Sequence, residues 1–231
     1  MQNNIGEEKA KYRMNPTAAL STKLGFRPAS GIRETIATGL ASLDAMIEGF
    51  PRGAISEIIG QESSGRTTLI HALLAASTSK FEICAYVDTC DSFDPVSAAA
   101  AGVSLSQLVW IRCGNNAEHA LKAADYLLHA GGFGAVVLDL CQIHPRAANR
   151  IPISYWYRFR LAIENTPTIL ALVEIEPLAK SCASLMLEMR RKKTVWSGSP
   201  GFQLLRGVEL EAVPRKPVRP ATASFKARAL G

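Results

Sequence analysis

Residues 60–69, with the sequence GQESSGRTTL, limit the fold of this chain more than any other segment. They follow a short apolar run, AISEIIG, that starts at Ala54, and they lead into TTLIHALLAAST, whose apolar residues recur near helical spacing. A strand, a glycine-rich loop and a helix in this order form a phosphate-binding loop, in which backbone N–H groups and the helix N-terminus surround a phosphate. The sequence therefore predicts a sheet that carries such a loop at the end of one strand.

The predicted loop departs from the usual pattern, G-x-x-x-x-G-K-[ST], at a single position, because Arg66 stands where lysine is expected. Arginine is longer, planar and forked, so it can hold a phosphate without occupying the same place as a lysine ammonium. We therefore expect nucleotide binding to survive and efficient hydrolysis to be lost. The alternative is an empty loop from which Arg66 points to solvent. The expected nucleotide-binding residues of the loop are Gly60, Glu62, Ser63, Ser64, Gly65, Arg66, Thr67 and Thr68.

Asp139 is expected to complete the nucleotide site. It ends the apolar run GAVVLDL, where a carboxylate can bind magnesium directly or through water. The hydroxyl of Thr67 is the second expected metal ligand, as in other phosphate loops. The alternative for Asp139 is an aspartate that only caps a turn. The cofactors expected from these residues are ATP and Mg²⁺.

The rest of the chain alternates apolar runs with helical patterns. ICAYVD, LVWIRC and TILALVEI read as strands, and AEHALKAADYLLHA and SYWYRFRLAIEN read as helices. Near-continuous apolar strands between helices indicate a parallel sheet that is covered on both faces. The last two runs, ASLMLEMRRKKTVW and FQLLRGVELEAV, are longer and are separated by SGSPG, which predicts an antiparallel pair. The expected fold class is α/β: a P-loop fold with a mostly parallel β-sheet, flanking helices and a C-terminal antiparallel β extension.

The helical run from Ser154 mixes aromatic residues with arginines, a mixture that single-strand-binding surfaces use to stack bases. Tyr155, Phe159 and Ile163 are spaced by four residues, which favours core packing over base stacking.

Three parts of the chain are expected to behave differently. Residues 1–30 are polar and aperiodic and predict a flexible leader. Residues 31–213 predict one core domain with its β extension, since 231 residues allow one substantial core. Residues 214–231 have no apolar period and predict a basic flexible tail.

The positive charge of the chain is concentrated near its end. Residues 1–189 contain 16 Lys and Arg against 18 Asp and Glu, whereas residues 190–231 contain 10 against 2. Such a segment suits nucleic acid, although a solvated basic surface is an equally open interpretation. The expected DNA-binding residues are Arg146 and Arg150 in the segment after Asp139, then Lys180, and the run Arg190, Arg191, Lys192 and Lys193. A charged strand edge that resists aggregation is the alternative for this run.

Other functional classes find little support in the sequence. The five cysteines lack C-x-x-C spacing, so neither a disulfide framework nor a zinc site is expected. The four histidines share no metal-binding spacing. No apolar run approaches 18 residues and the N-terminus lacks a signal-peptide core, so we expect a cytoplasmic protein without a membrane partner.

The motifs resemble those of the RecA recombinase family. TGLASLD, the phosphate loop, YVDTCDSFDP and the VVLD strand follow one another in family order and with family spacing, from residue 38 to residue 191. The resemblance implies a RecA-like fold, an ATP site, single-stranded DNA binding and a role in DNA recombination or repair.

The same resemblance identifies positions at which the chain departs from the family. The glutamate that activates water in the family corresponds to Cys90, a residue that cannot act as that base. Asp91 is adjacent, but a neighbouring side chain on an extended segment points elsewhere. The polar phosphate sensor is replaced around residues 174–176, where an acidic side chain would repel a phosphate. The following DNA-binding loop is reduced to EPLAK. A weak or inactive ATPase is therefore the prediction.

The C-terminal third, in EPLAKSCASLMLEMRRKKTVWSG and FQLLRGVELEAVPRKP, resembles the ImuA proteins, the RecA-like members of bacterial mutagenesis cassettes. This resemblance implies an accessory role in the SOS response and in translesion synthesis at the bacterial nucleoid. The implied partners are single-stranded or damaged DNA, an ImuB-like Y-family polymerase homologue and an error-prone polymerase, with self-association or RecA contact also open. The alternatives are an active DNA-dependent ATPase or recombinase in which Arg66 and Asp91 act, and a scaffold without DNA affinity.

Overall fold

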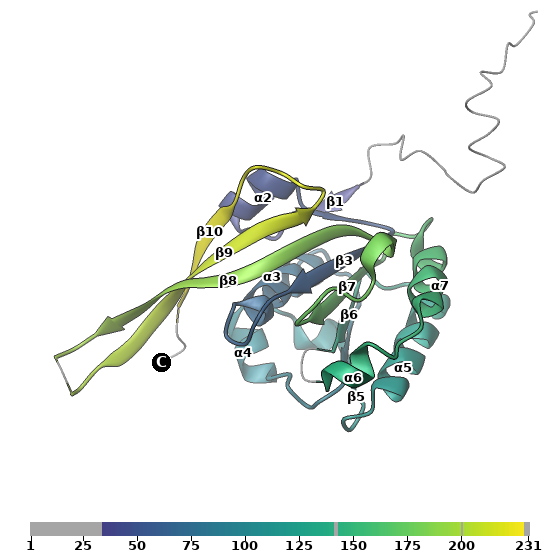
Figure 1. Cartoon of the computed structure of the whole chain (residues 1–231), viewed down its shortest axis with the longest axis horizontal. Helices are drawn as coiled ribbons and strands as arrows, with labels where there is room; N and C mark the ends of the chain where they lie inside the picture. Colours follow the sequence, from purple (N-terminus) through teal and green to yellow (C-terminus); the bar gives the residue numbers. More distant parts are fainter. Residues whose placement is uncertain (1–33, 141–142, 200, 229–231) are drawn as a thin grey trace, which may run out of the picture. The chain divides into compact units, whose positions relative to one another are not determined.

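The computed structural model describes residues 34–140, 143–199 and 201–228 (Figure 1). The predicted leader, residues 1–30, lies outside the described residues. The described chain forms one sheet with eight strands, flanked by helices, and a separate pair of short strands.

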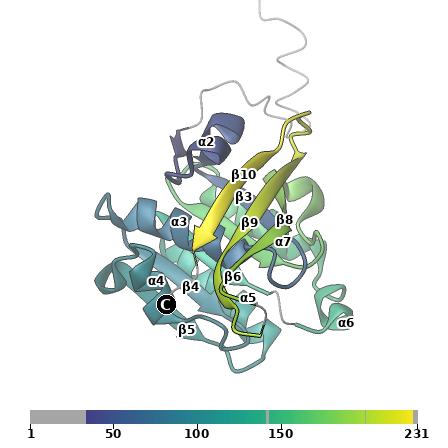
Figure 2. The ribbon, with the colours of Figure 1, turned by 90° about the vertical axis from the view of Figure 1, so that its left-hand side faces the viewer.

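The large sheet has the strand order β10-β9-β8-β3-β7-β6-β4-β5. The strands β3, β7, β6, β4 and β5 are all parallel to their neighbours, and β8 is parallel to β3. β9 is antiparallel to both of its neighbours, β8 and β10. Figure 2 shows β8, β9 and β10 side by side at one edge. The strands are β3 (Ala54–Ile59), β4 (Cys84–Asp88), β5 (Leu108–Arg112), β6 (Ala135–Asp139), β7 (Ile169–Glu174), β8 (Ala183–Ser197), β9 (Leu204–Lys216) and β10 (Ala223–Arg228). The predicted fold class is confirmed: a mostly parallel α/β sheet with a C-terminal antiparallel extension.

The helices and the short strands fill the connections. The small sheet pairs β1 (Thr35–Ile36) with β2 (Phe50–Pro51). The helices are α2 (Ala41–Ile47), α3 (Arg66–Thr78), α4 (Pro95–Ala100), α5 (Ala117–Ala130), α6 (Pro145–Ala148) and α7 (Ile153–Ile163), with 3₁₀ turns η1 (Leu105–Gln107) and η2 (Lys180–Cys182). Among the residues that the structure describes, none of the helices is long and apolar enough to cross a membrane.

Side-chain caps explain where two of these helices begin. Asp94 precedes α4 and accepts hydrogen bonds from the backbone N–H groups of Val96 and Ser97, with Pro95 at the first helical position. Asn116 precedes α5 and accepts from the N–H groups of the second and third helical residues in the same way. These caps fix the loops that follow β4 and β5, close to the site described below.

The sheet separates two hydrophobic layers because successive strand residues point to opposite faces. In β3, Ile58 joins the layer that contains Leu69 and Leu73 of α3, whereas Ile55 joins the layer that α5 and α7 cover. Phe159 and Ile163 are fully buried in this second layer and Tyr155 packs against it. The predicted core stripe of the helix is therefore confirmed, and these rings are not a base-stacking surface.

The C-terminal residues differ from the expected flexible tail. β9 continues to Lys216, and β10 pairs antiparallel with β9 from Ala223↔Ala212 to Arg228↔Gly207. Ala223 is buried in the first hydrophobic layer and Phe225 packs against it. Apolar side chains at alternate positions were enough to form an edge strand once β9 supplied the backbone partners, so the boundary predicted at residue 214 is wrong.

Candidate nucleotide site

The loop between β3 and α3 has the backbone geometry of a phosphate-binding loop. Gly60 has φ 151° and Gly65 has φ 91°, and Ser63 between them also adopts a left-handed conformation with φ 57°. A Cβ atom at Gly60 would collide with the carbonyl oxygen of Met189, and one at Gly65 would collide with the side chain of Leu210. Both glycines are therefore required by sterics as well as by backbone angle. The predicted strand, loop and helix are confirmed.

The N-terminus of α3 is available to an anion. Gly65 is its N-cap, and no side chain of the described residues caps the first turn. The N–H groups of such a turn and the helix dipole together favour a negative group in front of the helix. The buried Oγ atom of Ser64 also lacks a hydrogen-bond partner among the described residues. A phosphate in front of the helix would satisfy the uncapped N–H groups of its first turn.

Arg66 does not point to solvent. Its side chain is only 8% exposed, and Nη1 donates a hydrogen bond of 2.9 Å to the backbone carbonyl oxygen of Glu174 at the end of β7. The structure therefore excludes the interpretation of a solvent-facing arginine over an empty loop. This bond ties the first residue of α3 to the end of a neighbouring strand and holds the guanidinium at the wall of a cavity.

The cavity in front of α3 has a volume of about 330 Å³. It brings together the loop and the end of β6, as the sequence predicted for Thr67 and Asp139. Its walls are mostly polar and are formed by Glu62, Ser63, Arg66, Thr67, Tyr86, Ser92 and Asp139. Tyr86 and Ser92 were not predicted from the sequence. Tyr86 lies two residues before Asp88 on β4, so the two side chains point to the same face of the sheet.

Asp139 lies at the end of β6 with 6% of its surface exposed. Its Oδ2 atom accepts hydrogen bonds from the Tyr86 hydroxyl (2.6 Å) and from Ser92 Oγ (3.2 Å). No group of three or more His, Cys, Asp or Glu side chains able to hold a metal occurs in the described part of the chain. The carboxylate of Asp139 and the hydroxyl of Thr67 fit magnesium, which takes one or two carboxylates and completes its shell with phosphates and water. Thr67 and Asp139 thus remain the predicted ligands.

Asp88, at the end of β4, shapes the turn beside the cavity. It is fully buried, and it accepts hydrogen bonds from the backbone N–H groups of Ser92 (2.9 Å) and Phe93 (3.0 Å) and from Trp110 Nε1 (3.1 Å). Three donors on one carboxylate hold the turn that places the Ser92 hydroxyl against Asp139.

Cys90 lies in this turn and is poorly suited to accept a proton. Burial raises the pKa of its thiol, and the nearby carboxylates of Asp139, Asp88 and Asp91 raise that pKa further. The thiol therefore stays protonated at neutral pH. It supplies no general base where the family resemblance places one.

Asp91 does not replace the missing base. It adopts a left-handed conformation with φ 57°, and both carboxylate oxygens bind Arg112, with Nε–Oδ1 at 2.9 Å and Nη2–Oδ2 at 3.0 Å. Hydrogen bonding to this guanidinium lowers the pKa of Asp91. An exposed carboxylate held in this way is a weak proton acceptor, so the arrangement disfavours the alternative in which Asp91 acts in hydrolysis.

Glu174 corrects the expectation that an acidic residue at the end of β7 repels a phosphate. Its side chain is 2% exposed and does not line the phosphate cavity. Burial raises its pKa well above the usual value, and hydrogen bonding and charge repulsion from Glu57 raise it further. The protonated form of Glu174 is therefore favoured, and the Glu57 carboxyl is the group beside it.

Glu57 is the residue of this region that sequence reasoning missed. It is fully buried in β3, and its Oε1 atom accepts hydrogen bonds from the backbone N–H groups of Leu178 (2.8 Å) and Ala179 (2.5 Å). Its Oε2 atom is buried without a hydrogen-bond partner among the described residues, and the pKa of the neighbouring Glu174 is raised in part by hydrogen bonding to Glu57. The glutamate in the apolar run AISEIIG was the available signal, because a charged residue inside a buried strand needs a partner.

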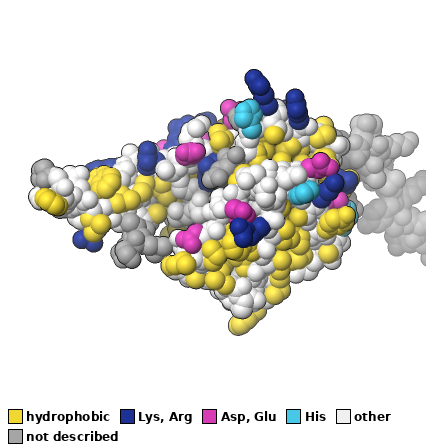
Figure 3. All heavy atoms as spheres, turned by 90° about the horizontal axis from the view of Figure 1, so that it is seen from below, with side chains coloured by type: hydrophobic (Ala, Val, Ile, Leu, Met, Phe, Trp, Pro, Cys, Tyr) yellow, Lys and Arg dark blue, Asp and Glu magenta, His cyan; other side chains and the backbone are white. Residues whose placement is uncertain are grey.

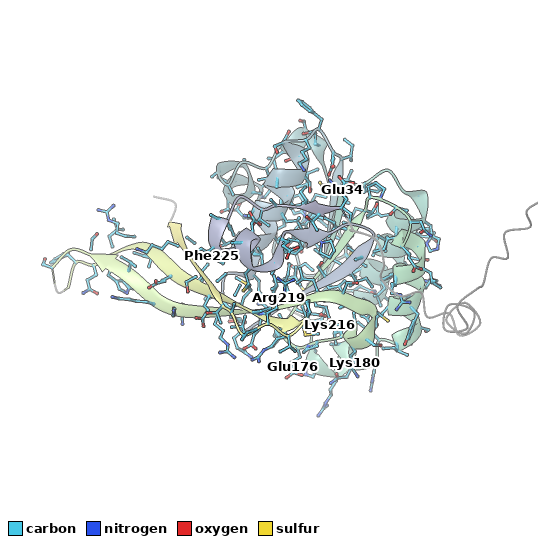
Figure 4. All side chains as sticks on the ribbon, turned by 90° about the horizontal axis from the view of Figure 1, so that it is seen from above. Glu34, Glu176, Lys180, Lys216, Arg219 and Phe225 are labelled. Atoms are coloured by element: carbon cyan, nitrogen blue, oxygen red, sulfur yellow. The ribbon has the colours of Figure 1, made fainter. Side chains whose placement is uncertain are left out.

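The predicted DNA-binding residues lie on separate elements. Arg146 belongs to α6 and Arg150 follows it, and both are exposed. Lys180 begins η2 with φ 50°. Figure 4 shows it beside Lys216, whose Nζ atom donates to the carbonyl oxygen of Ser181 at 3.0 Å. These residues are accessible, but they do not form one patch with the basic run of β8.

The basic run of β8 is partly neutralised by glutamates. Arg190 pairs with Glu188 (2.7 Å) and Lys192 pairs with Glu211 (3.4 Å). Arg191 instead lines a groove beside the phosphate loop that also includes Gln61 and Glu62. Two cations of the run are thus in exposed ion pairs, which add little stability, and the other two, Arg191 and Lys193, make no ion pair with a described carboxylate.

Comparison with known proteins gives a consistent result. Residues 19–149 match the family model described as the RecA N-terminal domain. Protein RecA of Rickettsia prowazekii (strain Madrid E) is 42% identical over 119 residues, which are 51% of this chain and 34% of the relative. Protein RecA of Borrelia turicatae (strain 91E135) is 32% identical over 181 residues, which are 77% of this chain and 50% of the relative. The chain thus spans half or less of the length of these curated relatives.

Proposed function

The chain belongs to the RecA family, and on this premise we propose that it is a DNA-repair accessory protein that binds ATP but hydrolyses it weakly or not at all. The observation that carries the proposal is the hydrogen bond from Arg66 to the Glu174 carbonyl inside an otherwise complete phosphate loop. It keeps a guanidinium, which can bind phosphate, at the cavity wall.

Binding is supported by groups that need no catalytic chemistry. The uncapped N-terminus of α3 favours phosphate oxygens. Thr67 and Asp139 share the cavity and would hold Mg²⁺, which would neutralise phosphate charge. The residues present therefore fit a magnesium nucleotide.

Hydrolysis lacks two contributions. A missing general base typically costs about 10²–10⁴ in rate, and a displaced charge donor costs about 10²–10³. Cys90 is a protonated thiol and Asp91 is bound to Arg112, so neither restores the base. Such losses are often not additive, but either alone places turnover far below that of a working ATPase.

The cellular role follows from the two resemblances. We propose an ImuA-like part in SOS translesion synthesis in the bacterial cytoplasm, on single-stranded or damaged DNA near the nucleoid. The proposed protein partners are an ImuB-like Y-family polymerase homologue and an error-prone polymerase. The cations of α6, η2 and β8 support the DNA contact, and salt-dependent titration with single-stranded DNA would distinguish it from a scaffold without DNA affinity.

Side-by-side measurement of ATP binding and ATP hydrolysis tests the proposal. The wild-type protein is compared with the double variant Arg66→Lys plus Cys90→Glu, and each single variant serves as a control. We expect the wild type to bind ATP with a turnover near background, and the double variant to gain DNA-stimulated turnover at similar affinity. Robust turnover by the wild type would refute the weak-ATPase proposal. Absence of ATP binding in both proteins would refute the nucleotide proposal.

A further inference from the structure

The hairpin formed by β8 and β9 projects beyond the rest of the sheet (Figure 1), and hydrophobic side chains gather at its end (Figure 3). We call the described residues 190–199 and 201–206 the hairpin tip. Trp196 is 53% exposed, Phe202 is 85% exposed and Leu204 is 57% exposed. Large apolar side chains that gather on a projecting element indicate an interaction site rather than a core.

The charge of the hairpin tip is entirely positive. Between Met189 and Gly207 the sequence contains five Lys and Arg and neither Asp nor Glu. Arg190 pairs with Glu188 of β8, and Lys192 pairs with Glu211 of β9. Arg191, Lys193 and Arg206 make no ion pair with a carboxylate in the described ranges, so their charge is available to a partner. Free cations beside exposed rings are the combination that binds single-stranded nucleic acid, since phosphates take the cations and bases take the rings.

The register places the tryptophan on the same face as one of these cations. Arg191 lies opposite Leu210, and Trp196 lies opposite Leu205, and between these two pairs each strand has one bulge. Counting through both bulges puts Arg191 and Trp196 on one face, because cross-strand partners share a face. Leu205 is the cross-strand partner of Trp196. Leu210 also packs against Gly65, so this face leads from the phosphate loop to the hairpin tip.

The segment that follows β7 offers little room for a DNA contact. Only five residues separate the end of β7 from η2. Two of them, Leu178 and Ala179, are held by their backbone N–H groups to the buried carboxyl group of Glu57. A chain that binds single-stranded DNA needs another surface, and the hairpin tip has both the charge and the rings.

We propose that the hairpin tip binds single-stranded DNA, with bases stacked on Trp196 and Phe202 and phosphates bound by Arg191, Lys193 and Arg206. The proposal rests on the DNA-binding part of the proposed function and assigns it to a surface. Aliphatic neighbours such as Leu204 also suit a protein partner. The unpaired cations and the two exposed rings favour nucleic acid.

Anisotropy titrations of fluorescein-labelled oligothymidine with the full chain test the proposal. Trp196→Ala and Phe202→Ala are compared with Phe81→Ala, a matched control because Phe81 is 88% exposed and lies outside the hairpin. We expect each tip variant to weaken binding about tenfold, in line with the value of base–aromatic stacking, and Phe81→Ala to change it less than about twofold. Trp196→Phe should restore most of the affinity. Arg206→Ala should lower the slope of log K against log salt by about 1.

The outcomes separate this inference from the proposed function. If the wild type binds no oligothymidine, both the DNA contact and the hairpin proposal fail. If it binds and both tip variants bind as tightly as Phe81→Ala, the hairpin proposal fails while the DNA contact stands. Equal losses for single strands and for a duplex of the same length would also overturn it, since stacking requires unpaired bases. Tip variants that keep DNA affinity but alter sedimentation would identify a protein interface instead.

Discussion

Two carboxylic acids end neighbouring strands of the sheet, and they lie in opposite environments. Asp139 ends β6 and pairs in register with Val173, the residue before Glu174 in β7. Asp139 faces the phosphate cavity and accepts hydrogen bonds from two hydroxyl groups. Glu174 points to the opposite face, where burial beside Glu57 raises the pKa of its carboxyl group.

The difference is one of position in the pleat rather than of residue type. An offset of one residue along a strand moves a side chain from one face of the sheet to the other. β6 therefore presents its terminal acid to the loop and to α3, whereas β7 presents only its terminal carbonyl oxygen, which Arg66 binds. Glu174, which stands at the position of the predicted phosphate sensor, therefore does not face the phosphate cavity.

Glu57→Ala should produce the largest effect, because it removes the partner on which the burial of Glu174 depends. The backbone N–H groups of Leu178 and Ala179 would lose their acceptor, and the Glu174 carboxyl would be left alone in an apolar layer. We expect a loss of about 3 kcal/mol in the free energy of unfolding, the usual scale for breaking a buried pair. Urea denaturation measures it.

Glu57→Gln is the matched control, since it keeps an acceptor oxygen for both N–H groups and an amide that can donate to Glu174. It should cost about 1 kcal/mol. Equal losses in the two variants would show that the carboxyl group itself matters at this position, since glutamine keeps the shape and the acceptor oxygen of glutamate.

The fold was predictable because its signals are local. The apolar strand before the loop, the glycines and the helical period after it all lie within one short segment, and each agreed with the others. Asp139 was predictable for the same reason, since it ends an apolar run and therefore lies at the carboxyl edge of the sheet.

The remaining features depend on contacts between distant segments. The pairing of Glu57 with Glu174 requires β3 to lie beside β7, and that of Asp91 with Arg112 requires β4 to lie beside β5. Strand neighbours and register are set by packing of the whole sheet, which local patterns do not encode. β10 was missed for the same reason: residues 223–228 become a strand only where β9 supplies hydrogen-bond partners.

Glu174→Gln should remove a dependence of stability on pH. The folded state raises the pKa of Glu174, so the folded chain keeps a proton that the unfolded chain releases near pH 4.5. This contribution to stability is complete below that pH and is lost as the pH rises toward the folded-state pKa, at about 1.4 kcal/mol per pH unit. Glutamine does not titrate, so the variant should be the more stable protein at neutral pH.

Thermal and urea unfolding at several pH values between 4 and 8 measure the difference between wild type and Glu174→Gln. The expected difference grows with pH. If the difference in free energy of unfolding stays constant across this range, Glu174 is already ionised in the folded chain despite its burial.

Asp139→Asn probes the other acid and should have a smaller effect, confined to the metal. The asparagine oxygen can still accept from Tyr86, so we expect the free energy of unfolding to change by less than about 1 kcal/mol. Binding of ATP in the presence of Mg²⁺ should weaken about tenfold, because a hard cation prefers a charged oxygen, and binding in EDTA should stay unchanged. Calorimetric titration measures both. Equal weakening with and without Mg²⁺ would assign Asp139 a structural role only.

Asp91→Asn should have the smallest effect and so tests whether any acid beside Asp139 takes part in hydrolysis. Both oxygens of Asp91 bind Arg112, and this contact lowers the Asp91 pKa, which makes the group a poorer base. Phosphate release, with and without single-stranded DNA, should therefore match that of the wild type within about twofold. Arg112→Ala is the control, because it frees the same carboxylate without removing it. If Asp91→Asn abolished a turnover that Arg112→Ala increased, Asp91 would be the base, and the chain would be an active ATPase with a relocated catalytic acid rather than a nucleotide-binding accessory protein.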